Sequence, residues 1–161
     1  MPAHIIDGVI TFLATELEDM AVWDGEVPRY STDQTPIAPS STNNLVWPVV
    51  KVYMREGGFR RNPTTEDPYD DEGDLLVQVW GITRQQEEAV LDSIEAIFAQ
   101  ASNWPLISLG GPADNPYYVI SMLLTSWYSG QEEEARTGMS QLLYRGELHY
   151  ETRIHGAIVS L

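Results

Sequence analysis

Residues 140–154 alternate between apolar and polar side chains. A period of two is typical of a β-strand with one buried and one exposed face. Gly146 interrupts the pattern and indicates a β-bulge. Such a strand needs neighbouring strands and a second layer that covers its apolar face. The apolar set is Leu142, Tyr144, Leu148, Tyr150 and Ile154, and the polar set is Arg145, Glu147, His149, Glu151 and Arg153.

Three further segments predict strands of the same sheet. Residues 117–128 (YYVISMLLTSWY) are apolar on both faces, which is typical of a central strand covered on both sides. The short acidic turn that follows, 129–138, predicts a hairpin with the strand at 140–154. Residues 47–55 (WPVVKVYMR) and 74–80 (DLLVQVW) are rich in β-branched and aromatic residues and also alternate.

Two segments predict amphipathic helices. Between residues 5 and 20 the apolar side chains recur at steps of three and four residues. A second helix begins after Thr83, because Thr83 and Gln86 form a T-x-x-Q capping box. Its expected apolar stripe comprises Val90, Leu91, Ile94, Ile97, Phe98 and Ala101.

The order of these elements is helix, strand, strand, helix, strand, strand. We therefore expect residues 1–161 to form one α+β domain with two layers. One layer is a mainly antiparallel sheet of about four strands, and the other is a pair of helices on one face of it. Long loops are expected at about 21–46, 56–73 and 129–139. Connections of such length are usually functional or disordered.

The charge of the chain excludes several classes of partner. It carries 9 Lys and Arg residues against 24 Asp and Glu residues, for a net charge of −15. This surface repels phosphate backbones and anionic lipids, although DNA could slide past it without sticking. The chain has no cysteine, no signal-peptide pattern at its start and no apolar run long enough to span a bilayer. We expect a soluble protein, made in the cytoplasm, with no membrane partner.

No pattern of residues indicates catalysis, a cofactor or a metal. His4, His149 and His155 lack the spacing of metal ligands and are interpreted as surface histidines. The acidic stretch from Glu66 to Asp74 does not match a calcium-binding loop. The glycine pairs at 57–58 and 110–111 have neither the lysine of a phosphate-binding loop nor a dinucleotide-binding spacing, so we expect turns there. We therefore expect that the protein is not an enzyme.

The basic and aromatic residues of the loops are candidates for an interface. Arg55, Arg60 and Arg61 lie beside Phe59 and form a basic cluster. Nucleic-acid binding is one interpretation of it, but ion pairing across a subunit interface with the acidic runs at 66–74 or 132–134 suits the net charge better. Aromatic residues beside loops, namely Trp23, Trp47 and Trp104, are candidate interface anchors.

The arrangement as a whole resembles the tail terminator (tail completion, or minor tail) proteins of long-tailed bacteriophages. The resemblance is carried by the opening helix at 5–20, the long loop into WPVVKVYMR, and the strand DLLVQVWG that runs directly into its helix. It is completed by the closing hairpin of YYVISMLLTSWY and LLYRGELHYETRI. It covers most of the chain and is one of arrangement, without a diagnostic motif.

This resemblance implies a structural virion protein that is assembled in the host cytoplasm. Subunits of the family form a ring, typically a hexamer, that caps the tail tube and joins it to the head. The implied partners are further copies of the chain, the tail tube protein and the head-closure or neck proteins, while DNA passes through the lumen. Phe59, Arg60, Arg61, Trp23 and Trp47 would then contribute to subunit interfaces. The acidic run Glu132, Glu133 and Glu134 would face the lumen.

Two alternatives stay open. The chain could be another phage neck or tail component, such as a head-closure or tube protein, which would also form rings. It could instead be a non-phage soluble adaptor that binds a peptide or a small molecule between its helices and its sheet.

Overall fold

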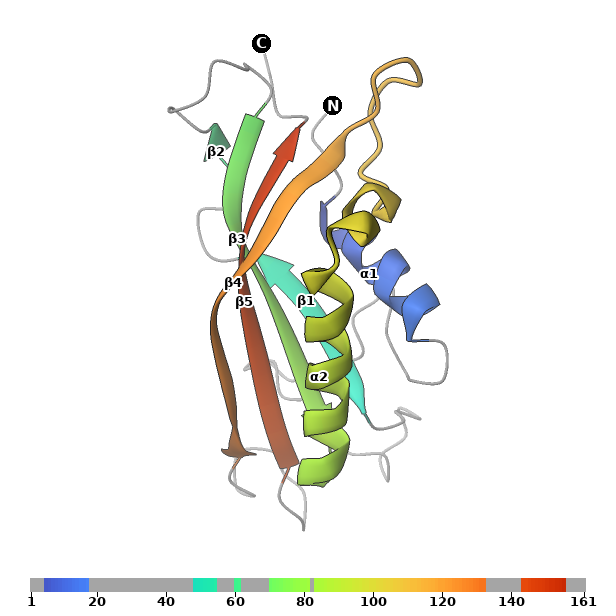
Figure 1. Ribbon diagram of the computed structural model, residues 1–161. Helices are drawn as coiled ribbons and strands as arrows, with labels where there is room; N and C mark the ends of the chain where they lie inside the picture. Colours follow the sequence, from blue (N-terminus) through green and yellow to red (C-terminus); the bar gives the residue numbers. More distant parts are fainter. Residues whose placement is uncertain are drawn as a thin grey trace, which may run out of the picture.

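The computed structural model describes residues 5–17, 48–54, 60–61, 70–81, 83–132 and 143–155. Within these residues the chain alternates between helices and strands in the expected order, with two short additions (Figure 1). The elements are α1 (Ile5–Glu16), β1 (Val49–Met54), β2 (Arg60–Arg61), β3 (Asp70–Gly81), α2 (Arg84–Ala99), the 3-10 helix η1 (Ala101–Leu106), β4 (Tyr118–Glu132) and β5 (Leu143–His155).

The described strands form one antiparallel sheet in the order β1-β3-β5-β4. The short strand β2 pairs with β3 beyond the end of β1, so β1 and β2 share the same side of β3. Strands β4 and β5 form the expected closing hairpin. The expected α+β fold, with an antiparallel sheet and two helices, is therefore confirmed.

Both helices pack on one face of the sheet, as Figure 1 shows. Phe98 of α2 is fully buried and joins the two layers: its ring stacks on Phe12 of α1, with centroids 6.2 Å apart, and meets the Tyr150 ring of β5 edge-on at 5.3 Å. We call this side the helix face and the opposite side the far face. The alternation in β5 is confirmed, because Leu148 is buried on the helix face whereas Glu147 lies on the far face.

The predicted start of α2 is also confirmed. Thr83 is the N-cap residue, and its Oγ1 accepts a hydrogen bond from the backbone N–H of Gln86 at 3.1 Å. This bond satisfies one of the donors that a helix leaves free at its first turn. The predicted stripe is inward along α2, with Val90, Leu91, Ile94 and Phe98 buried and Ile97 partly buried. Ala101, its last expected member, instead lies in η1 and is exposed. Helix α1 ends at Glu16 with a turn at Leu17, while the rest of its expected range lies outside the described residues.

The prediction of a continuous loop over residues 56–73 is wrong in two respects. Strand β2 lies within it, and β3 begins at Asp70 rather than at residue 74. Acidic residues are disfavoured in strands, but here they have basic neighbours across the sheet. Glu72 is paired in register with Arg60 of β2 on one side and with Arg153 of β5 on the other.

The assignment of 117–128 as a central strand is wrong, because β4 lies at the edge of the described sheet. Its apolar residues are divided between the core, where Val119 and Met122 are buried, and the surface, where Leu123 and Trp127 are exposed. The strand also continues to Glu132, so the loop expected at 129–139 begins later. A two-sided apolar pattern therefore marks an uncovered edge in this chain.

The β-bulge expected at Gly146 is wrong as well. Gly146 pairs regularly with Val79 and Ser129, and the register shifts lie in β4, between Val119 and Ser121 and between Leu124 and Ser126. A glycine is needed at this position for a different reason. Helix α2 crosses β5 so closely that a Cβ atom on residue 146 would overlap the side chains of Leu91 and Glu87.

Candidate functional site

The candidate interface residues fall mostly outside the described residues. This applies to Trp23, Trp47, Phe59, Glu133 and Glu134. Backbone positions are given for Arg60 and Arg61 in β2 and for Glu132 at the end of β4. The other anchor that we expected, Trp104, is internal: it is half-buried against the core, and its indole N–H donates to the Phe98 carbonyl at 2.9 Å. Trp104 thus closes the end of α2.

The register of β2 bears directly on the expected role of its two arginines. Arg60 is opposite Glu72 and Arg61 is opposite Asp71, all within the same chain. Opposite charges that face each other across an antiparallel pair stabilise the pairing. Pairing within the subunit therefore competes with the intersubunit pairing that the sequence predicts.

Strand β4 presents an apolar edge to solvent. Leu123 is 63% exposed and Trp127 is 68% exposed, and a little under half of the surface of Tyr118 and Tyr128 is exposed. Among the described strands, only β5 pairs with β4. Natural proteins protect such edges with charges, prolines or covering segments, because an uncovered edge associates readily with other chains.

A polar network crosses the far face of the sheet. The Gln78 amide of β3 donates to Glu147 Oε1 of β5 at 2.6 Å and lies 3.2 Å from the Tyr53 hydroxyl of β1. Glu147 Oε2 lies 3.1 Å from His149 Nε2. His149 is therefore not the solvated surface histidine that we expected. His155 also has a neighbour, the stacked ring of Tyr118 at 5.0 Å.

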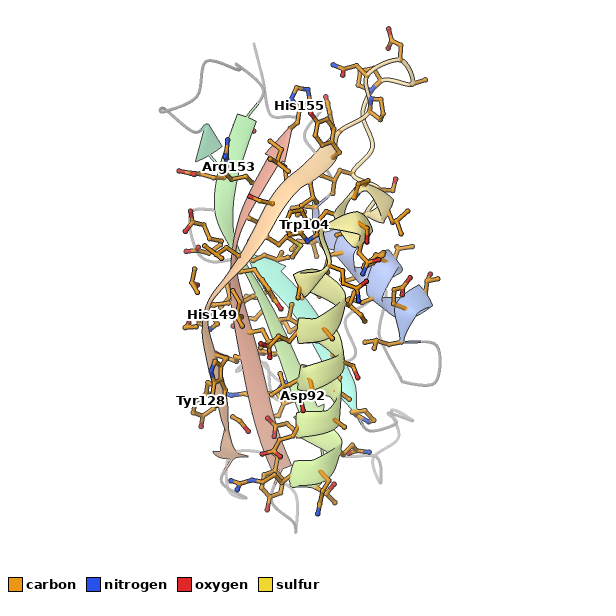
Figure 2. The ribbon with its side chains drawn as sticks, in the orientation of Figure 1. Asp92, Trp104, Tyr128, His149, Arg153 and His155 are labelled. Carbon is orange, nitrogen blue, oxygen red and sulfur yellow. The ribbon has the colours of Figure 1, made fainter. Side chains whose placement is uncertain are left out.

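Arg145 extends this network towards the sheet edge. Its guanidinium lies 5.7 Å from the Trp80 ring of β3 and 5.4 Å from the Tyr128 ring of β4. It is also within 4.0 Å of Glu147. Figure 2 shows Tyr128 and His149 on the side of the sheet away from the helices. The network ties all four long strands together through side chains.

The electrostatics of Glu147 show that its carboxylate is held as an anion. Burial acts to raise the pKa of Glu147, but the hydrogen bonds from Gln78 and His149 and the charge of Arg145 outweigh it. The pKa of Glu147 is therefore below its ordinary value. An anion held in this way stabilises the sheet and is a weak proton donor or acceptor near neutral pH.

A second carboxyl group lies on the helix face and was missed by sequence reasoning. Glu87, in the first turn of α2, is fully buried, and the Ser129 hydroxyl of β4 donates to its Oε2 at 2.9 Å. Burial raises the pKa of Glu87, although the hydrogen bond from Ser129 opposes the shift. From the sequence alone, Glu87 is only an acid near the start of a helix, where the helix dipole favours a negative charge.

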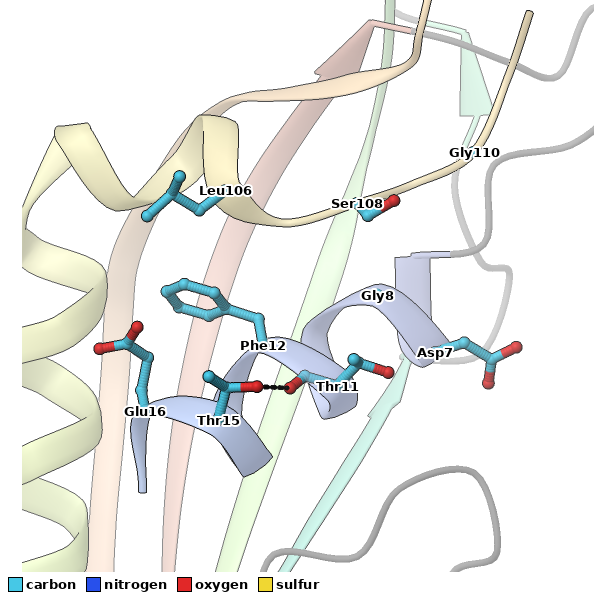
Figure 3. Close-up of a pocket in the computed structure, with 9 residues that line it drawn as sticks. All are labelled: Asp7, Gly8, Thr11, Phe12, Thr15, Glu16, Leu106, Ser108 and Gly110. Carbon is cyan, nitrogen blue, oxygen red and sulfur yellow. Dashed lines mark hydrogen bonds between the residues drawn. The ribbon is translucent and has the colours of Figure 1, made fainter. Parts of the chain in front are cut away.

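A cavity in the described part of the chain opens between α1 and the segment that follows η1 (Figure 3). Its volume is about 680 Å³. The walls bring together Thr, Ser, Asp and Glu side chains and two glycines, with Phe12 and Leu106 as the large apolar residues. The full lining is Asp7, Gly8, Thr11, Phe12, Thr15, Glu16, Leu106, Ser108 and Gly110.

The described residues assemble no catalytic constellation at this cavity. Its lining contains no histidine, lysine or arginine. The hydroxyl of Thr15 donates a hydrogen bond to the backbone carbonyl of Thr11 at 3.1 Å. Throughout the described ranges, no three His, Asp or Glu residues gather in a way that could hold a metal ion. None of the helices there is long and apolar enough to cross a membrane.

Comparison with known proteins adds no identification, because neither a protein-family model nor a curated protein sequence matches the chain. The function is therefore inferred from the geometry of the described residues. It shows a sheet stiffened by side-chain networks, with an apolar strand at its edge.

Proposed function

We propose that the chain is a structural subunit that assembles into a ring, and that this ring caps a phage tail tube and joins it to the head. The observation that carries the proposal is the free edge of β4, which no other described strand than β5 joins. The strand runs over 15 residues, whereas strands usually have ~5–6. A long edge strand with exposed apolar side chains favours pairing with another chain.

The two edges of the sheet differ, which favours a ring over a simple dimer. One edge is β4, and the other consists of β1 and β2. Contact between unlike surfaces of successive subunits is heterologous, and a heterologous contact closes into a ring when its rotation allows. Pairing of β4 with a second β4 would instead give a two-fold dimer.

The tail-terminator assignment itself rests on the resemblance of arrangement described above. The net charge of −15 supports it, since a DNA conduit should not bind the phosphates that pass through it. We assign the run that begins at Glu132 to the lumen, because this acidic run follows the last residue of β4.

The test is a measurement of mass for the purified chain, alone and with tail tubes. Leu123→Glu should reduce assembly at least about tenfold, because a charge would be buried in the contact. Leu106→Glu is the matched control: Leu106 is also 63% exposed but lies in η1, away from β4. A wild-type chain that stays monomeric at high concentration and beside tail tubes would contradict the proposal.

The adaptor function remains a second candidate because of the cavity beside α1. Its lining combines apolar surface from Phe12 and Leu106 with hydroxyl and carboxylate groups, which suits a small ligand that has both apolar and polar parts. A monomer that binds such a ligand, with Phe12→Ala lowering the affinity, would favour this function over the ring.

A further inference from the structure

A groove separates α2 from the edge strand β4 on the helix face. Its volume is about 200 Å³. The apolar part of the lining is Leu91, Leu148 and the ring of Trp127, and the acidic part is Glu88, Asp92 and Glu95 of α2. Ser129 completes the lining. This groove is separate from Leu123, which pairs opposite Glu151 and so projects from the far face.

The groove exists because of two local features of the hairpin. Helix α2 packs mainly on β5 and β3, above Gly146, and makes fewer contacts with β4. The register shift between Leu124 and Ser126 then brings Trp127 opposite Leu148, on the helix face. Bulges commonly re-aim side chains in this way. Without the extra residue, the Trp127 ring would lie on the far face.

One end of the groove is closed by the bond between Ser129 and the buried Glu87. The other oxygen of this carboxyl group, Glu87 Oε1, is buried and has no hydrogen-bond partner among the described residues. The bond between Ser129 and Glu87 thus links the two walls of the groove at this end.

The rim of the groove is anionic. Glu88, Asp92 and Glu95 follow one another at steps of four and three residues, which places them on one flank of the helix. Arg84 lies 3.9 Å from Glu88, but both side chains are largely exposed, so this pair contributes little. Asp92 and Glu95 have no ion-pair partner within the described ranges. Figure 2 shows Asp92 on the helix beside the sheet.

We propose that this groove binds a basic, extended segment of a partner protein, with an arginine or lysine side chain lodged between Trp127 and the acids of α2. The aliphatic stem of such a side chain fits the apolar floor of Leu91 and Leu148 while its charged end reaches the rim. A tryptophan face is the best aromatic surface for a cation. An arginine or lysine side chain can contact the apolar floor, the Trp127 ring and the acids of α2 at the same time.

Charge decides between a different protein and a second copy of the chain. With 24 acids and 9 basic residues, a second copy of the chain offers few cations to the groove, whereas a basic partner is attracted over a distance. The occupant is therefore a segment of another protein. This inference does not depend on the ring, because it uses the helix face and not the far-face contact of Leu123.

The probe is a short capped peptide that alternates arginine with valine, titrated by calorimetry against the full chain. A peptide with glutamate in place of arginine should not bind. The double variant Asp92→Asn/Glu95→Gln and the single variant Trp127→Leu should each weaken binding by about tenfold, while Trp127→Phe should weaken it less. Each variant is first checked for an unchanged melting temperature, since all three positions are exposed.

The matched control is Asp114→Asn/Glu151→Gln, which removes the same charge from two exposed acids outside the groove. Its affinity should stay within about twofold of the wild type, because distant surface charges are screened by salt. If the control loses as much affinity as the groove double variant, binding is general attraction to an acidic surface and the proposal fails. If the peptide does not bind and Trp127→Leu instead abolishes self-association, the groove is an interface between copies.

Discussion

Gly146 of β5 lies directly beneath Leu91 of α2, so closely that a Cβ atom on the glycine would overlap the leucine side chain. The same Cβ would meet Glu87 Oε1 at 2.5 Å. The glycine is thus required by the approach of the helix and not by the backbone conformation. It sets the height of α2 above the sheet and, with it, the shape of the α2–β4 groove.

Gly146→Ala should therefore destabilise the fold. Overpacking a tight contact costs about 1–3 kcal/mol, since neither the helix nor the strand can move without losing other contacts. Urea denaturation would measure the free energy of unfolding. Ser126→Ala, at an exposed position of β4, is the control and should change it by less than about 0.5 kcal/mol. Equal stability of Gly146→Ala and the wild type would show that α2 is not held at this height.

Glu87→Gln should change how stability depends on pH. Because burial raises the pKa of Glu87 in the folded state, its contribution is fully present below the unfolded pKa of about 4.3. The contribution is lost as the pH rises through the folded pKa. Glutamine does not titrate, so the stability of the variant relative to the wild type should increase from acidic to neutral pH. Denaturation at several pH values checks this, and a difference that falls with pH would contradict it.

Glu147→Gln should show the opposite dependence. The folded pKa of Glu147 is lowered, so its contribution is present above the unfolded pKa of about 4.3 and is lost as the pH falls through the folded pKa. At neutral pH the variant should be less stable by about 1–3 kcal/mol, since hydrogen bonds to a charged group are lost. The deficit should shrink in acid. Each glutamate variant serves as the control for the other, because the same buffer changes should give slopes of opposite sign.

The parts of the fold that the sequence predicted well depend on local patterns. The alternation around Leu148 and the cap at Thr83 are decided within a few residues, and both appear in the structure. The two-layer arrangement follows from them, because an alternating strand and an amphipathic helix each leave one apolar side to cover. The turn expected at Gly110 and Gly111 lies slightly later, at residues 113–114, although both glycines have positive φ angles.

The parts that the sequence did not predict depend on contacts between distant residues. Glu87 is buried only because Gly146, far along the chain, lets α2 approach the sheet. Strand β3 begins early because Glu72 has arginines opposite it from two other strands. The edge position of β4 depends on strand order, which the two-sided apolar pattern of the segment does not encode.

The role of Arg60 and Arg61 can be decided by charge reversal. In the structure both lie opposite acids of their own chain, Glu72 and Asp71. Arg60→Glu with Arg61→Glu would place like charges across this pairing, so the free energy of unfolding of the monomer should fall by roughly 0.4–2 kcal/mol for the two pairs. Reversing Asp71 and Glu72 to lysine in the same chain should restore part of the loss. If the arginines instead serve neighbouring subunits, the monomer melts normally and only ring assembly weakens, in the direction that added salt also weakens it.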